Sequence, residues 1–408
     1  MLLMLLLGVG ALAVFVSGLN RATSQLERDR ITNVALAQAK EALIGYAVSV
    51  ALSSGCGTNC PRPGELPCPD NWPQGSGNEG TPSSPCNGNA IGRLPWKKLG
   101  LPDLRDAAGE RLWYAVSNNY KNSSRFFPLN SDTQGTISMR ASNGTLLADA
   151  TSGTGVAAVI FSPGAILTRQ DGVAQNRNAA GYNNPVNFLD IANGEDNQDF
   201  VNGLNNGFIQ GPIKDASNSV ILNDILITLS RDDIMRVVEK RVAAEVANVL
   251  IPLLGSLPNP AAFSDTDCLG FAVILSTKCQ SAAINRGRIP ANPSPAWSGS
   301  AVFLNGILNN NWFQQNGWRE FIYYTTGSLT LNNLPGAPII GLQALVIITG
   351  SVLPGQNRSA SANKVLEANY LEDENLTPLD DTYTLRPASM ATPFNDKVRC
   401  LSSSSPNC

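Results

Sequence analysis

The sequence predicts an α+β protein: a long N-terminal membrane-spanning helix followed by two tandem antiparallel β modules, the second preceded by its own amphipathic helix. Residues 1–19 carry no charge, and residues 20–52 continue at helical spacing without a proline. Short β-type runs then alternate with turn-rich segments, on both sides of a second helical stretch near Ser230. The expected domains are a transmembrane helix over 1–19, its amphipathic extension over 20–54, a first β module over 55–229, a second amphipathic helix over 230–254 and a second β module over 255–408.

The first helix combines an apolar part with a one-sided part. At 1.5 Å per residue the uncharged run is about 28 Å long, close to the roughly 30 Å hydrocarbon core of a bilayer. A cleaved signal peptide fits less well, because no basic residue lies near Met1 and 15–18 is a poor cleavage site. Beyond it, helical spacing puts an apolar stripe on one face: Ile31, Ala35, Ala39, Ala42, Tyr46 and Val50, with Leu36, Leu43 and Ala47 beside them. One helix of about 50 residues is therefore expected.

The rest of the chain predicts strands and one further helix. Candidate strands lie at 112–116, 135–139, 156–161 and 220–229. Ser230 followed by two aspartates is typical of a capped helix start, and Pro252 and Gly255 mark its end. The apolar stripe of this helix is that of an ordinary core helix: Ile234, Val237, Val238, Val242, Val246, Val249 and Leu250.

Segments of the first half recur in the same order in the second half, which indicates a duplicated module. The corresponding pairs are 66–70 with 257–260, 111–114 with 319–323, 158–164 with 345–350, 175–177 with 356–358, 187–190 with 369–372, and 223–224 with 395–396. The alternative is a chance resemblance between two Asn-rich β domains.

The eight cysteines form an even set in local clusters, which predicts disulfides in an oxidising compartment. Zinc is the competing interpretation, since Cys56 and Cys60 have tolerable ligand spacing. Zinc is disfavoured because paired C-x-x-C knuckles and histidines are both missing from the sequence. Proximity along the chain suggests the pairs Cys56 with Cys60, Cys68 with Cys86, Cys268 with Cys279, and Cys400 with Cys408.

The composition argues against an enzyme. The chain has no histidine, which excludes Ser-His-Asp and Cys-His catalysis and His-ligated metals. Ser361 and Lys364 match S-x-x-K, but the S-D-N and K-T-G partners of that motif are missing from the sequence. The G-x-G-x-x-G match at 75–80 lies in a turn-rich loop. A net charge of −3 and a pI near 5.2 give no basic field for nucleic acid.

Several segments of the first half of the chain resemble a known protein family. The stretch ALAQAKEALIGYAVS (35–49), with RPGELPCPD (62–70), Cys86 and 92–117, is similar to prepilin-like proteins of the type IV pilin and pseudopilin group. The resemblance implies two pilin-like β modules and a structural filament subunit of a type IV pilus or type II secretion machine. It further implies a single-pass inner-membrane location with a periplasmic or cell-surface domain. The pair Cys400 and Cys408 resembles the C-terminal disulfide loop of pilins. The partners implied are other pilin or pseudopilin subunits and the membrane, both contacted by the apolar helix residues Leu2, Leu5, Leu6, Leu7, Val9, Leu12, Val14, Phe15, Val16 and Leu19.

Two departures from the family refine the expectation. The usual basic leader is absent, so either the start lies upstream or standard processing is missing, and Leu5 stands where typical pilins have glutamate. In the family, loss of that glutamate marks a tip pseudopilin, so a minor tip or priming subunit is expected. The alternatives are a pilus-borne adhesin of unknown ligand or a membrane-tethered periplasmic binding protein. No cofactor is expected, although the acidic segments 372–374 and 380–381 could hold calcium.

Overall fold

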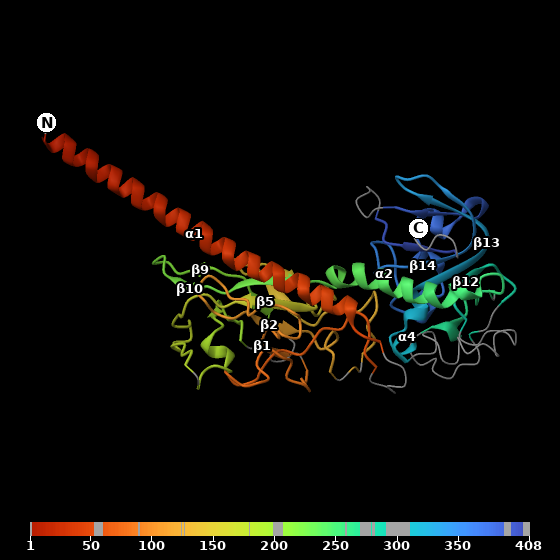
Figure 1. Ribbon diagram of the computed structural model, residues 1–408, viewed down its shortest axis with the longest axis horizontal. Helices are drawn as coiled ribbons and strands as arrows, with labels where there is room; N and C mark the ends of the chain where they lie inside the picture. The colour runs from red at the N-terminus through yellow and green to blue at the C-terminus, as the bar shows by residue number, and fades with distance from the viewer. Residues whose placement is uncertain are drawn as a thin grey trace. The chain divides into compact units, whose positions relative to one another are not determined.

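The computed structural model describes residues 2–52, 60–88, 90–123, 125, 127–178, 180–198, 207–257, 259–269, 279, 282–290, 311–386 and 393–402; within the first helix, side chains are described from Thr23 onward. The chain forms two compact units (Figure 1). Unit 1 comprises Met1–Leu43, Pro67–Asn118 and Gly135–Leu229, and unit 2 comprises Ile44–Leu66, Asn119–Gln134 and Ser230–Cys408.

The first element, α1 (Leu2–Ser49), is a single helix of 48 residues. Its buried positions recur every three or four residues, as on one face of a helix: Thr32, Ala35, Leu36, Ala39, Leu43 and Ala47. The buried stripe is rotated slightly from the expected one, because Ile31 is exposed while Ala42 and Tyr46 are only half-buried. The Thr32 hydroxyl accepts a hydrogen bond from the backbone N–H of Ala107 at 3.2 Å, which ties this face to unit 1.

The structure contradicts the prediction of a membrane-spanning helix. Across the described side chains, no helix is both long and apolar enough to cross a bilayer. The physical reason is charge: from Thr23 onward α1 carries ionised side chains in successive turns, among them Glu27, Arg30 and Lys40. The ten apolar residues proposed for membrane and filament contact, from Leu2 to Leu19, lie in the part of α1 whose side chains are outside the described set.

Unit 1 contains a four-stranded antiparallel sheet in the order β1-β2-β5-β11. Its strands are β1 (Ala90–Arg93), β2 (Trp113–Val116), β5 (Ala158–Ser162) and β11 (Ile225–Leu229). The two central strands are buried at every position, as expected for apolar runs covered on both faces. The core beside them is formed by Trp113, Ala115, Ile137, Met139, Ala148, Val156, Val159, Phe161, Tyr182, Phe188, Leu189, Phe208 and Leu226.

Shorter strands complete unit 1. They are β3 (Ser138–Arg140), β4 (Leu146–Ala148) and β8 (Gly207–Ile209) in one sheet, β6 (Ile191–Ala192) with β7 (Glu195–Asp196), and β9 (Ile213–Lys214) with β10 (Val220–Leu222). The single strand expected over 220–229 is therefore two strands, interrupted at Asn223 and Asp224. The interruption occurs because the Asn223 backbone N–H donates to the Asp190 carboxylate rather than to a strand.

Unit 2 pairs α2 (Arg231–Leu250) with a sheet in the order β12-β13-β14-β16. These strands are β12 (Arg286–Arg288), β13 (Ile322–Asn333), β14 (Ile339–Ile348) and β16 (Lys397–Leu401), all paired antiparallel, while β15 (Thr382–Leu385) runs parallel to the end of β13. Helix α2 packs against β14 and β16 with an apolar face that includes Ile234, Val238, Val242 and Val246. The long β13–β14 hairpin is visible in Figure 1.

Short helical turns connect these elements. They are η1 (Pro185–Asn187), η2 (Ile251–Leu253), η3 (Thr266–Cys268), α4 (Asn311–Gln315), η6 (Trp318–Phe321), α5 (Ser361–Lys364), η7 (Glu367–Asn369), α6 (Asp373–Leu376) and η8 (Leu379–Asp381).

Candidate functional site

The four-stranded sheet of unit 1 and four of the five strands of the unit 2 sheet have the same strand order and the same residue register. In unit 1, Arg93 lies opposite Trp113, Trp113 opposite Phe161, and Phe161 opposite Leu226. In unit 2 the corresponding row is Arg288, Tyr323, Ile347 and Val398. Each row thus begins with an arginine on the first strand and continues with large apolar or aromatic side chains.

Both arginines are buried and stack on aromatic rings. The Arg93 guanidinium lies 4.0 Å from the centroid of the Tyr182 ring, and that of Arg288 lies 3.8 Å from the Phe263 ring. Backbone carbonyls accept hydrogen bonds from both: Arg93 Nη1 donates to the Tyr182 carbonyl at 3.0 Å and Arg288 Nη1 to the Phe263 carbonyl at 2.8 Å. Burial lowers the pKa of both guanidinium groups from its ordinary value. They remain charged and are stabilised by ring faces and carbonyls, which makes them structural groups.

A hydrogen-bond network at the end of β5 contains a buried pair of acids, Asp190 and Asp224. Asp190 Oδ1 accepts from Gln175 Nε2 at 2.8 Å, and its Oδ2 accepts from the Asn223 backbone N–H at 2.8 Å. Asp224 Oδ2 in turn accepts from the Asp190 backbone N–H at 2.8 Å and from Asn197 Nδ2 at 2.9 Å. The four partners come from loops and strand ends, so the acid pair fastens these segments together.

The same network occurs at the end of β14 with Glu372 and Asp396. Glu372 Oε1 accepts from Gln356 Nε2 at 3.0 Å, and its Oε2 accepts from the Asn395 backbone N–H at 3.0 Å. Asp396 Oδ2 accepts from the Glu372 backbone N–H at 3.2 Å and from Asn375 Nδ2 at 3.1 Å. These four donors correspond one to one to those of the first network, and the Asp396 backbone N–H adds a fifth hydrogen bond, to Glu372 Oε2 at 3.1 Å.

An arginine closes each network in the same way. Arg177 donates to the Asn187 carbonyl at 2.9 Å and to the Gly164 carbonyl at 2.7 Å. Arg358 donates to the Asn369 carbonyl at 2.5 Å and to the Gly350 carbonyl at 2.9 Å. Three of the segment pairs recognised in the sequence, 175–177 with 356–358, 187–190 with 369–372 and 223–224 with 395–396, therefore make equivalent contacts in the two units.

A cavity lies between a helix and equivalent residues in each unit. The cavity of about 840 Å³ in unit 1 is lined by α1 residues 25–33 and by Gly164, Ala165, Leu167, Asn223 and Ile225. The cavity of about 450 Å³ in unit 2 is lined by α2 residues and by the counterparts Gly350, Ser351, Leu353, Asn395 and Lys397. The linings mix apolar and charged side chains, and each contains a serine hydroxyl that donates to a carboxylate: Ser162 to Asp106 at 2.8 Å in unit 1 and Ser230 to Asp233 at 2.9 Å in unit 2.

The acid pairs are electrostatically unusual. Burial raises the pKa of Asp190 to about 6. Burial also raises the pKa of Asp224 well above its usual value, and the neighbouring Asp190 charge raises it further. The pKa of Asp396 is likewise raised well above its usual value by burial and by the charge of Glu372. The cause is the same in both units: two carboxyl groups share a site that water does not reach.

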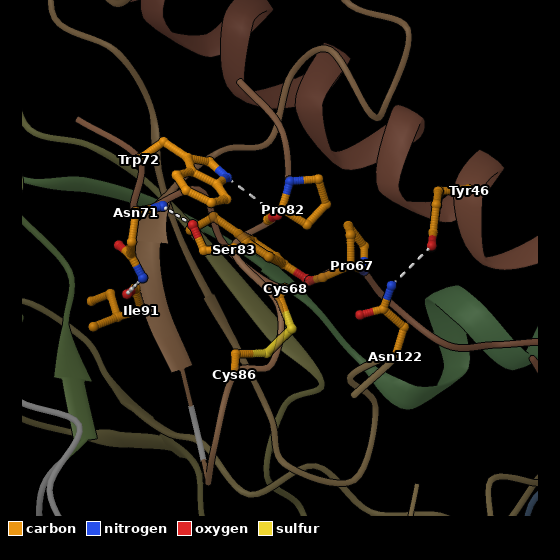
Figure 2. Close-up of a disulfide and its surroundings, with 11 residues drawn as sticks. Tyr46, Pro67, Cys68, Asn71, Trp72, Pro82, Ser83, Cys86, Ile91 and Asn122 are labelled. Atoms are coloured by element: carbon orange, nitrogen blue, oxygen red, sulfur yellow. Dashed lines mark hydrogen bonds between the residues drawn. A yellow bond between two sulfur atoms is a disulfide. The ribbon is translucent and has the colours of Figure 1, made fainter. Parts of the chain in front are cut away.

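Two disulfides lie within the described residues, and both are pairs expected from proximity along the chain. Cys68 is bonded to Cys86 and Cys268 to Cys279. The first encloses a loop in which the Asn71 backbone N–H donates to Ser83 Oγ and Trp72 Nε1 to the Pro82 carbonyl (Figure 2). Cys60 and Cys400 are disulfide-bonded as well, whereas Cys56 and Cys408 lie outside the described residues.

The acidic segments considered for calcium have other roles. Glu372 belongs to the buried network, Asp373 and Glu374 form ion pairs with Arg386, and Asp380 and Asp381 lie in a left-handed turn. In the described ranges no three acidic, cysteine or histidine side chains converge in an arrangement that could hold a metal ion. The sequence paired the segments of the acid networks but did not predict that the two acids of each network are in contact, because that contact joins residues 24 to 34 positions apart.

Comparison with known proteins gave no match: no family model, curated protein or solved structure is similar enough to this chain to be counted.

Proposed function

We propose that this protein is a minor structural subunit of a type IV pilin-like filament, and that α1 is the element through which it joins the filament. The observation that carries the proposal is the exposed part of α1. Every residue from Thr23 to Ile31 is exposed, whereas from Thr32 onward one face of the same helix is buried. The helix therefore continues beyond the part that the unit itself covers.

The exposed part carries apolar side chains that a filament neighbour would cover. Leu26 is 70% exposed and Ile31 is 38% exposed, and Val34, just beyond this part, is 42% exposed. Ion pairs and hydrogen bonds within the helix, such as Arg30 with Glu27, keep this part helical without help from the unit. A long helix with unburied apolar positions is stabilised when a second helix packs on it.

The disulfides support an extracytoplasmic location, in the periplasm or on the cell surface. Four of the eight cysteines form the two pairs described, and disulfides persist in oxidising compartments. A tip or priming position rests on the sequence alone, since Leu5 stands where the resembling family carries glutamate.

Assembly is tested by shearing filaments from cells that make the protein and measuring its share of the filament fraction. Leu26→Asp should lower that share by about tenfold, since burying a leucine contributes on the order of 1.5 to 3 kcal/mol. Gln38→Asp is the matched control, because Gln38 is exposed on the part of α1 that already packs on unit 1. Both variants should keep the helical circular dichroism of the wild type.

The proposal fails if the wild-type protein is missing from sheared filaments, or if Leu26→Asp enters them as well as Gln38→Asp does.

A further inference from the structure

The two buried acid pairs, Asp190 with Asp224 and Glu372 with Asp396, share one feature beyond their common donors. One oxygen in each pair, Oδ1 of Asp224 and Oδ1 of Asp396, is buried and accepts no hydrogen bond from the described part of the chain. The other oxygen of each aspartate accepts two hydrogen bonds. The same oxygen is thus left over in two networks that lie in separate units.

An ionised carboxylate with one unsolvated oxygen is costly in a buried site, and a second carboxylate beside it adds repulsion. A neutral carboxylic acid avoids both costs, because the proton sits on the oxygen that lacks a donor. In unit 2 the backbone N–H of Glu372 donates to the Asp396 carboxyl group and the backbone N–H of Asp396 donates to the Glu372 carboxyl group, which places the two acids beside each other.

We propose that Asp224 and Asp396 are held as neutral acids at neutral pH. Each β unit then contains a pH-sensitive carboxyl pair, and the unit loses stability as the pH rises. Each pair then carries at most a single negative charge.

The cationic groups around each pair stabilise that single charge without neutralising a second one. Near the first pair, Arg177 and Arg169 act on Asp190, and both are already engaged by other carboxylates. Near the second pair, Arg358 is paired with Asp132 and Lys397 with Glu239. The remaining charged neighbours are themselves paired: Glu110 with Arg177, Asp171 and Asp196 with Arg169, Glu195 with Arg140, and Asp373 and Glu374 with Arg386.

The pH dependence follows from the direction of the shift. Because the acids hold their protons in the folded state and lose them near pH 4 when unfolded, the folded state binds more protons above that pH. The stability that each acid contributes is fully present below the pKa of the acid in the unfolded chain. This contribution is lost as the pH rises toward the pKa of the acid in the folded protein. The unfolding equilibrium constant should increase by up to about tenfold per pH unit for each retained proton.

The amino-acid composition leaves few other side chains that titrate in this pH range. The chain has no histidine, so the side chain that ordinarily titrates between about pH 5 and 8 is missing from it. The buried acids are then the main side chains that can produce a slope in this window.

The test is urea unfolding of the full chain from about pH 5 to pH 9, followed by tryptophan fluorescence. Buried tryptophans report on both units, Trp113 on unit 1 and Trp318 on unit 2. The double variant Asp224→Asn and Asp396→Asn reproduces the neutral acid, because its amide oxygen can accept the two hydrogen bonds and its NH2 group replaces the protonated oxygen. Asp215→Asn is the control, since the Asp215 carboxylate is exposed in a turn with its pKa lowered by hydrogen bonds from Ser217 and Ser219.

The expected result is a wild type and an Asp215→Asn variant whose stability falls with rising pH, and a double variant whose stability falls less steeply, because only the remaining buried acids such as Asp190 and Glu239 still respond. A pH-independent wild type, or a double variant with the wild-type slope, overturns the proposal. If the double variant fails to fold, infrared spectroscopy of the wild type at pH 7 tests the proposal instead. A carbonyl band of protonated carboxyl groups supports neutral acids, and the absence of this band refutes them.

Discussion

Ser230 and Asp233 cap each other at the start of α2. Ser230 Oγ accepts a hydrogen bond from the Asp233 backbone N–H at 3.1 Å, and Asp233 Oδ2 accepts one from the Ser230 backbone N–H at 2.9 Å. Two N–H groups that the helix cannot satisfy are thereby satisfied. We expect Ser230→Ala to lower the free energy of unfolding by about 1 kcal/mol. Urea unfolding measures this, and Ser361→Ala, at an exposed serine, should change it little.

The close approach of Gly350 to Asn395 leaves no room for a side chain. A Cβ at Gly350 would lie 2.4 Å from Asn395 Cγ, well inside van der Waals contact. Gly350→Ala should therefore displace Asn395, whose backbone N–H is a donor of the acid network, and destabilise unit 2 by about 1 to 3 kcal/mol. Thermal unfolding is the measurement. Gly77→Ala is the control, since a Cβ there meets nothing within 4 Å; equal effects of the two substitutions would contradict the prediction.

Gly45 lies in α1 with open space around it. It is exposed, and a Cβ at this position meets nothing within 4 Å. Glycine in a helix interior costs about 0.5 to 1 kcal/mol relative to alanine, because its unfolded backbone has more freedom to lose. Gly45→Ala should stabilise the protein by about that amount, which calorimetry or urea unfolding would detect. A destabilised Gly45→Ala variant would show that this residue has a role beyond the helix.

The ion pair between Lys397 and Glu239 joins β16 to α2 in a buried setting. Glu239 is nearly inaccessible to solvent, and burial raises the pKa of its carboxyl group. Lys397→Met leaves this carboxylate without its cation, which should cost about 3 to 5 kcal/mol near neutral pH. Below the Glu239 pKa the deficit should shrink, because a protonated Glu239 no longer needs the cation.

Unfolding of Lys397→Met at neutral and acid pH checks both expectations. Lys240→Met is matched in chemistry but exposed on the solvent side of α2, so it should have little effect at either pH. A Lys397→Met deficit that does not depend on pH would exclude the ionised Glu239 as its cause.

Local patterns predicted the helices and the central strands of the first sheet. Helical spacing gave α1 and α2 their apolar faces, and Ser230 marked the start of α2, because caps and periodicity act over three or four residues. The pattern was weaker for the sheet edges: the strand expected over 220–229 is interrupted at Asn223, where a distant carboxylate competes for the backbone. The apolar N-terminal run predicted a membrane span that the described part of the structure does not contain.

By itself, the sequence determined the helical periodicity, the clustering of the cysteines and the order of the recurring segments. These properties depend on neighbours along the chain. Only the tertiary structure decided that Arg93 and Arg288 hold the same register position, and that Asp190 meets Asp224 as Glu372 meets Asp396. Their energies depend on the exclusion of water and on partners far away in sequence, and no local pattern contains that information.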